Sequence, residues 1–91
     1  MEFTDYDLGY QSAGAVVEVT LAGTEANVRL LDSSAFQSYR AGGQHQYYGG
    51  HYTKSPVHIP IPHNGYWHAA IDLGGYVGSV RSSVRVLSGV R

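Results

Sequence analysis

The stretch Val57-His58-Ile59-Pro60-Ile61-Pro62-His63-Asn64-Gly65-Tyr66-Trp67-His68-Ala69-Ala70-Ile71-Asp72-Leu73 decides the fold class of this 91-residue chain. Apolar and polar residues alternate on both sides of Asn64-Gly65, which is the pattern of a β-hairpin. A three-residue loop at 63–65 keeps the odd-numbered apolar side chains on one face, with Ile61 opposite Trp67, whereas a two-residue loop breaks that face. Pro60 cannot donate to a strand ladder, so we expect a sheet edge or a bulge there.

Further strands are predicted on both sides of this hairpin. Residues 15–21 and 26–31 each place alternate apolar side chains on one face, as half-buried strands do. Their connector is short, so we expect them to form a second antiparallel hairpin. Residues 3–8 are expected to form an edge strand, and residues 76–87 are expected to form the last strand.

One segment has the pattern of a short helix. Ser34 and Gln37 have the spacing of a capping box, and Phe36 and Tyr39 lie three residues apart on one helical face. Gly42 supplies a stop signal. We therefore predict one or two helical turns near residues 34–41, docked through the two aromatic side chains.

Five to seven short strands and one helical turn indicate an all-β protein. We expect a single domain over residues 1–91, built as a small antiparallel β-sandwich that is jelly-roll-like or resembles a flattened barrel. The expected inner layer is Val17, Val19, Leu21, Val28, Leu30, Phe36, Val57, Ile59, Ile61, Trp67, Ile71, Val84 and Val86.

Composition excludes several classes of function. The chain has no cysteine, so disulfides and thiolate chemistry are excluded. A net charge of −1 without a basic run argues against nucleic acid. No apolar run approaches the roughly 20 residues of a membrane helix, and the acidic start, unlike a signal peptide, leads us to expect a cytoplasmic protein.

The charges are segregated along the chain. Residues 1–32 carry six acidic groups against one arginine, which gives −5, and residues 33–91 carry five basic groups against one aspartate, which gives +4. The first interpretation is that the first and last strands lie side by side and that their outward charges pair across the sheet. The second is a bipolar surface through which copies of the chain associate head to tail.

Residues 43–55 are the favoured binding segment. They have no clear period and are expected to form a long loop, with a short strand at 46–48 as an alternative. The candidate ligand-binding residues are Tyr47, Tyr48, His51 and Tyr52, because tyrosine combines a large apolar face with a polar tip and is enriched at recognition surfaces. The alternative is that Tyr47 or Tyr48 closes one end of the core.

Metal binding and catalysis have weaker support. In the predicted hairpin, His58 and His68 lie diagonally on the outer face, within reach of a bridging metal ion, and Asp72 shares that face. The alternative is that these are solvent-facing residues without a role. No Gly-x-Ser-x-Gly or phosphate-loop pattern is present, so we predict neither catalytic residues nor a cofactor.

Several motifs together resemble a known family. They are Phe3-Thr4-x-Tyr6-Asp7-Leu8-Gly9, Val17-Glu18-Val19-Thr20-Leu21, Asn27-Val28-Arg29-Leu30-x-Asp32-Ser33-Ser34-x-Phe36, Tyr47-Tyr48-Gly49-Gly50, Ser55-Pro56-Val57 and Arg81-Ser82-Ser83-Val84-Arg85-Val86. The chain resembles a small bacterial family that is catalogued as a domain of unknown function. The resemblance implies a compact all-β fold and, because some relatives carry a TIR-type signalling domain, a sensing or adaptor role. It implies no catalytic residues.

The order of the elements is also similar, at the level of pattern, to secreted jelly-roll accessory domains that bind protein or carbohydrate. The sequence therefore predicts a non-enzymatic binding module whose partner is a protein or a glycan. Self-association as a homo-oligomer, through an edge strand or the segregated charges, is the alternative.

Overall fold

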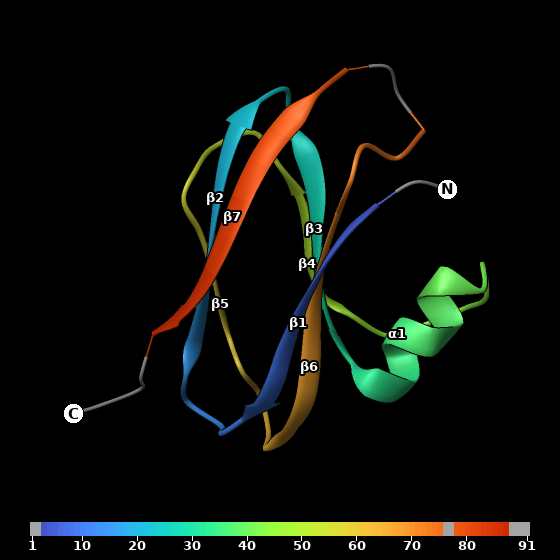
Figure 1. Ribbon diagram of the computed structural model, residues 1–91, viewed down its shortest axis with the longest axis vertical. Coiled ribbons are helices and arrows are strands. Elements are labelled where there is room, and N and C mark those ends of the chain that lie inside the picture. Colours follow the sequence, from blue (N-terminus) through green and yellow to red (C-terminus); the bar gives the residue numbers. More distant parts are fainter. Residues whose placement is uncertain (1–2, 76–77, 88–91) are drawn as a thin grey trace.

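The computed structural model describes residues 3–75 and 78–87 (Figure 1). Within them the chain forms a β-sandwich with one short helix. The strands are β1 (Thr4–Gln11), β2 (Val16–Gly23), β3 (Ala26–Asp32), β4 (Tyr48–Tyr52), β5 (Val57–Pro60), β6 (Gly65–Asp72) and β7 (Val80–Leu87), and the helix is α1 (Ser33–Arg40). No helix in this part of the chain is long and apolar enough to cross a membrane.

Two antiparallel sheets face each other. One has the strand order β1-β6-β3-β4 and the other has the order β5-β2-β7. Every pair of consecutive strands except β3 and β4 is divided between the two sheets. The predicted all-β sandwich is confirmed, and so is the predicted edge strand at the N-terminal end, because β1 lies at one edge of the four-stranded sheet.

The two predicted hairpins are wrong. β5 pairs with β2 and β6 pairs with β1 and β3, so the two halves of the 57–73 stretch lie in opposite sheets. The Asn64 side chain accepts a hydrogen bond of 2.7 Å from the backbone N–H of Ala13, which holds the turn against the link from β1 to β2. Strands β2 and β3, the other predicted hairpin, also lie in opposite sheets.

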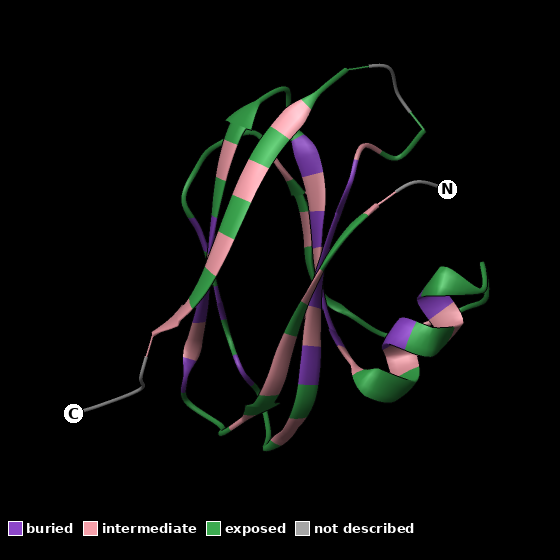
Figure 2. Cartoon of the chain, viewed as in Figure 1, coloured by how far each residue is buried: buried purple, intermediate pink, exposed green. Residues whose placement is uncertain are grey.

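The predicted strand faces are correct although the partners are not. Trp67 is 1 % exposed and lies between the sheets, and buried residues alternate with more exposed ones along much of β2, β3 and β5 (Figure 2). The core between the sheets consists of Ala15, Val17, Val19, Ala26, Val28, Leu30, Val57, Ile59, Ile61, Trp67 and Ile71. Leu21, Val84 and Val86 are half-buried against it, and Pro60 lies in an edge strand as its missing donor requires.

A second, smaller core lies under helix α1, on the outer face of the four-stranded sheet. Phe36 and Tyr39 pack there against Leu31 and Ala70. Phe36 was expected in the inner layer, and the short helix instead carries it to the opposite face. At Ala70 and Asp72 the even-numbered face of β6 is therefore buried under the helix and is not open to water as the alternation alone indicated, whereas Tyr66 at the start of the strand is exposed.

The helix begins one residue earlier than predicted. Asp32 is its N-cap, because its carboxylate accepts a hydrogen bond of 2.8 Å from the N–H of Ala35. The expected cap, Ser34, lies inside the first turn. The stop at Gly42 is as predicted: this residue has a φ of 81° and its N–H donates to the carbonyl of Tyr39.

Candidate functional site

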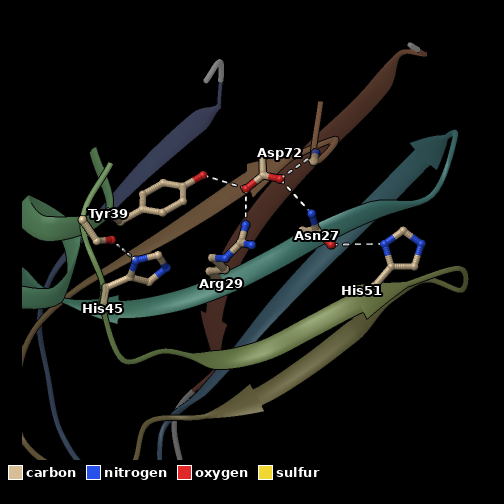
Figure 3. Close-up of polar contacts among 8 residues, drawn as sticks. Asn27, Arg29, Tyr39, His45, His51 and Asp72 are labelled. Atoms are coloured by element: carbon tan, nitrogen blue, oxygen red, sulfur yellow. Dashed lines mark hydrogen bonds and ion pairs between the residues drawn. The ribbon is translucent and has the colours of Figure 1, made fainter. Parts of the chain in front are cut away.

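The outer face of the four-stranded sheet carries a buried ionic network centred on Asp72. This residue is 2 % exposed. Its carboxylate accepts hydrogen bonds from Nδ2 of Asn27 (2.8 Å), the phenol of Tyr39 (2.7 Å) and the N–H of Gly74 (2.8 Å), and it forms an ion pair with Arg29. The network joins β3, β6 and helix α1 (Figure 3).

The environment of these groups moves their pKa values away from neutrality. Burial acts to raise the pKa of Asp72, but the hydrogen bonds from Asn27, Tyr39 and Gly74 and the charge of Arg29 outweigh it, so the pKa lies below its usual range. Burial and the neighbouring Asp72 carboxylate raise the pKa of Tyr39 well above its usual value. At neutral pH the pair therefore consists of a carboxylate and an intact phenol donor.

Arg29 links this network to the exposed surface. Its guanidinium lies 5.4 Å from the ring centre of Tyr39 and 5.1 Å from that of Tyr47. The imidazole of His45 lies 5.1 Å from the Tyr39 ring and 5.6 Å from the Tyr47 ring. We call Arg29, Tyr39, His45 and Tyr47 the Arg29 cluster, in which Tyr47 is exposed and His45 is half-buried.

A second polar chain leads from Asp72 to the surface of β4. Nδ1 of His51 lies 3.1 Å from Oδ1 of Asn27, which only accepts, so this ring nitrogen is the donor. Nε2 of His51 lies 3.2 Å from Oε1 of Glu25. Asn27 thus connects an exposed histidine on β4 with the buried carboxylate (Figure 3).

A shallow hollow lies next to the Arg29 cluster. Its volume is about 390 Å³, and it is lined by the start of α1 and by residues 44–46. Most of the lining is polar, with Asp32, Ser38, Gln44 and His45 among the contributors. The hollow is open to solvent, so this face resembles a contact surface more than an enclosed active site.

The structure divides the four predicted binding residues between two faces. Tyr47 packs on Arg29 of the outer face, and His51 bonds Asn27 there. Tyr48 and Tyr52 pair with Leu30 and Ala26, whose side chains point between the sheets, so these two tyrosines lie on the inner side of the same edge. Tyr48 is exposed, with its ring 6.0 Å from that of Trp67, whereas Tyr52 packs against the core.

The segment that carries these residues is more regular than expected. Strand β4 occupies Tyr48–Tyr52, so residues 43–55 are not one long loop. A short strand was expected at residues 46–48, but the observed strand begins only at Tyr48. Tyr52 packs against the core. The alternative interpretation placed Tyr47 or Tyr48 there, but both of these side chains are exposed, and Tyr47 and His51 face the outer surface.

The histidine pair considered as a candidate metal site is not brought together. His58 lies on β5 and His68 lies on β6, in opposite sheets. His58 contacts Glu18 at 3.0 Å, and His68 contacts Asp5 at 3.0 Å while stacking on Phe36 with ring centres 4.0 Å apart. In residues 3–75 and 78–87, no three His, Asp or Glu side chains lie close enough to hold a metal ion.

The segregated charges meet across the β2–β7 pair. Glu18 of β2 forms an ion pair of 2.5 Å with Arg85 of β7 and also contacts His58 of β5. The Arg85 and His58 contacts lower the pKa of the half-buried Glu18 carboxyl. This agrees with the first interpretation of the charge pattern, although the strand beside β7 is β2 and not β1.

Sequence reasoning missed Arg29, Tyr39 and His45 as members of a site. The signal for Arg29 was its position between Val28 and Leu30, which places it on the outer face of a half-buried strand. Asp72 was placed on that outer face by the sequence pattern, but only as a candidate third ligand of a metal ion. Its burial depends on helix α1, whose position the sequence pattern does not give.

The fold and the site together define a small β-sandwich with a tyrosine-rich surface at one sheet edge. Residues 1–89 match the model of the family described as Domain of unknown function (DUF1883), and the chain belongs to this family. No curated protein and no solved structure matches the chain.

Proposed function

We propose that this chain is a non-enzymatic recognition module that binds a protein partner through the Arg29 cluster and the neighbouring surface of β4. The observation that carries the proposal is the packing of Tyr47, which is 43 % exposed, on the guanidinium of Arg29. Arginine and tyrosine are among the residues that contribute most to protein interfaces. Here Asp72 holds the arginine in place before any partner arrives, which reduces the entropy lost on binding.

The chemistry of the site supports recognition over catalysis. A general acid or base works best with a pKa near neutral pH, whereas the pKa of Asp72 is lowered and that of Tyr39 is raised. Both groups are also engaged with each other by a hydrogen bond. The network therefore has the character of a structural support for Arg29.

A protein partner fits this surface better than a glycan. The Arg29 side of Tyr47 is occupied by the guanidinium, so one ring face is taken before a sugar could stack on it. The adjacent hollow is shallow and open, whereas small ligands favour enclosed pockets. A cytoplasmic adaptor role, which the resemblance implied, is part of this proposal.

Affinity capture with a matched pair of tyrosine variants tests the proposal. Wild type, Tyr47→Ala and Tyr10→Ala are compared as baits in extract from cells that contain the chain, and the captured protein is then purified and its affinity measured by calorimetry. Tyr10 is a suitable control because it is also exposed, at 55 %, and packs on Tyr66 away from Arg29. We expect Tyr47→Ala to weaken binding by about 30-fold or more, as for an interface hot spot, and Tyr10→Ala to bind like wild type.

Equal affinity of the wild type and Tyr47→Ala would contradict the proposed surface. A glycan array provides the second arm of the test. A glycan signal that Tyr47→Ala abolishes would show that the partner is a carbohydrate and not a protein.

Self-association is a second candidate function, and one observation favours it. Strand β4 lies at the edge of its sheet and pairs with β3 on one side alone within the described chain. Its other side presents backbone groups that a further strand could bind.

A further inference from the structure

Within residues 3–75 and 78–87 the sandwich has four edge strands, and three of them carry features that hinder pairing with another chain. Natural proteins protect edges with proline, charged side chains and bulges. β5 contains Pro60, and β7 carries Arg81 and Arg85. β1 carries two aspartates and a register shift between Asp7 and Gly9.

Strand β4 has none of these protections. Its sequence, Tyr48-Gly49-Gly50-His51-Tyr52, contains no proline, lysine, arginine, aspartate or glutamate. Its pairing with β3 runs from Tyr48 to Tyr52 without a register shift. Gly49 has a φ of 125° and departs from the extended conformation, so the edge is short and a partner strand would be held weakly.

We propose that the occupant of this edge is a second copy of the chain, paired antiparallel through β4 about a two-fold axis at Gly50. The inference rests on the second candidate function, self-association, and specifies its residues. The sequence of β4 is nearly symmetric about Gly50, with a tyrosine at each end. A two-fold interface requires such self-complementarity, because each residue meets its counterpart from the same patch.

The register follows from the strand faces. Opposite residues in an antiparallel pair lie on the same face of the sheet, so Tyr48 and Tyr52, both on the inner side, can face each other across the axis. The axis at Gly50 forms this aromatic pair twice. It also places Gly49 opposite His51, so the imidazole meets a residue without a side chain.

The neighbouring two-fold registers are less favourable. An axis at His51 sets the two imidazoles against each other, where like charges repel on protonation, and it places Tyr48 opposite Lys54. An axis at Gly49 sets Tyr48 opposite Gly50 and loses both tyrosine pairs. The resulting assembly joins two four-stranded sheets into one, with an Arg29 cluster from each copy on the shared outer face.

Cysteine cross-linking tests the register directly, because the chain has no cysteine of its own. We expect the fold to tolerate Gly50→Cys, since a Cβ added at position 50 meets no atom within 4 Å. Opposite residues in an antiparallel pair have Cα atoms about 4.5–5.5 Å apart, within the range of a disulfide. Under mild oxidation we expect Gly50→Cys to form a covalent dimer, and Thr20→Cys, exposed on the other sheet, to remain a monomer at the same concentration.

Light scattering over about two orders of magnitude in concentration measures the uncross-linked dimer. We expect the mass of the wild type to rise toward that of a dimer in low and high salt alike. Gly50→Lys, which adds an inward-facing edge charge, should keep the mass of a monomer, with circular dichroism confirming that it is folded.

The outcomes separate this inference from the proposals on which it stands. A dimer that forms in Gly50→Lys, or that dissociates in high salt, overturns the β4 register and leaves self-association through another surface. A wild type that stays monomeric at every concentration overturns both the β4 register and self-association as a function. Absence of a Gly50→Cys cross-link above that of Thr20→Cys also overturns the register, and none of these results bears on the Tyr47-dependent partner.

Discussion

The phenol of Tyr39 donates a hydrogen bond of 2.7 Å to the carboxylate of Asp72, and this bond ties helix α1 to strand β6. Both residues are buried, at 5 % and 2 % exposure. The same carboxylate holds Arg29 beneath Tyr47. One buried anion therefore fixes both the helix and the exposed aromatic surface.

Removal of this anion should destabilise the protein strongly. Asp72→Ala leaves the partly buried charge of Arg29 unpaired and removes the acceptor of Asn27 and Tyr39. Breaking one side of a buried ion pair costs about 3–5 kcal/mol, and we expect a loss in that range in urea unfolding. Glu25→Ala is the control, because this acidic side chain is exposed, at 59 %, and its change should stay within about 0.5 kcal/mol. Equal losses in the two variants would contradict the central role of Asp72.

Stability should fall in acid because of Asp72. Its folded pKa lies below the ordinary value of 3.8, so the folded state favours the carboxylate. The stabilisation is present above that value and is lost as the pH falls through the lower folded pKa. Asp72→Asn should show a smaller decline of unfolding free energy between about pH 5 and pH 2 than the wild type. The half-buried Glu18 contributes with the same sign and remains in both proteins, so the difference between the two curves isolates Asp72.

The opposite dependence is expected at alkaline pH from Tyr39. Its folded pKa is raised above 10.0, so its contribution is complete below pH 10 and is lost as the pH rises further. Tyr39→Phe should cost about 1–3 kcal/mol at neutral pH, because Asp72 loses a buried donor. The variant should also lose stability less steeply above pH 10, as measured by urea unfolding at several pH values. Parallel alkaline curves for the two proteins would show that Tyr39 ionises as freely in the folded state as in the unfolded one.

The sequence was sufficient to predict which strand side chains lie between the two sheets, although not the position of Phe36 on the helix. Val57, Ile59 and Trp67 are buried as their alternation indicated, because a strand places alternate residues on opposite faces whichever strand it pairs with. The pairing itself was predicted incorrectly. A short Asn-Gly turn is compatible with a hairpin and with a crossing between sheets, and here Asn64 bonds Ala13 in a crossing.

The candidate site was also predictable only in part, because the sequence indicates surface residues but not which strands are neighbours. Tyr47 and His51 were identified from composition, and both lie on the outer face of the sheet. The ion pair of Arg29 with Asp72 joins residues 43 positions apart, and it depends on β3 and β6 being neighbours. A pattern read along the chain does not give that neighbourhood, so the centre of the site emerged only with the sheet order.

The adjacent glycines of β4 should respond differently to alanine. An added Cβ at Gly49 would lie 2.2 Å from the carbonyl oxygen of Val28, and the φ of 125° is unfavourable for any side chain. At Gly50 an added Cβ meets no atom within 4 Å. We expect Gly49→Ala to destabilise the protein by more than about 1 kcal/mol and Gly50→Ala to be neutral or slightly stabilising. Thermal unfolding of the two variants measures this, and equal midpoints would mean that β4 does not lie against Val28 as described.

The tryptophan reports on the integrity of the core. Trp67 is 1 % exposed and its Nε1 donates to the carbonyl of His63. As the only tryptophan, it should give a blue-shifted emission in the folded protein that moves to the red in urea. Trp67→Ala should cost about 3–5 kcal/mol, because it leaves a cavity between the sheets. Its neighbour Tyr66, which is 62 % exposed, provides the control, and Tyr66→Ala should change stability by less than about 0.5 kcal/mol. A Trp67→Ala variant that unfolded with the midpoint of Tyr66→Ala would contradict the position of Trp67 between the two sheets.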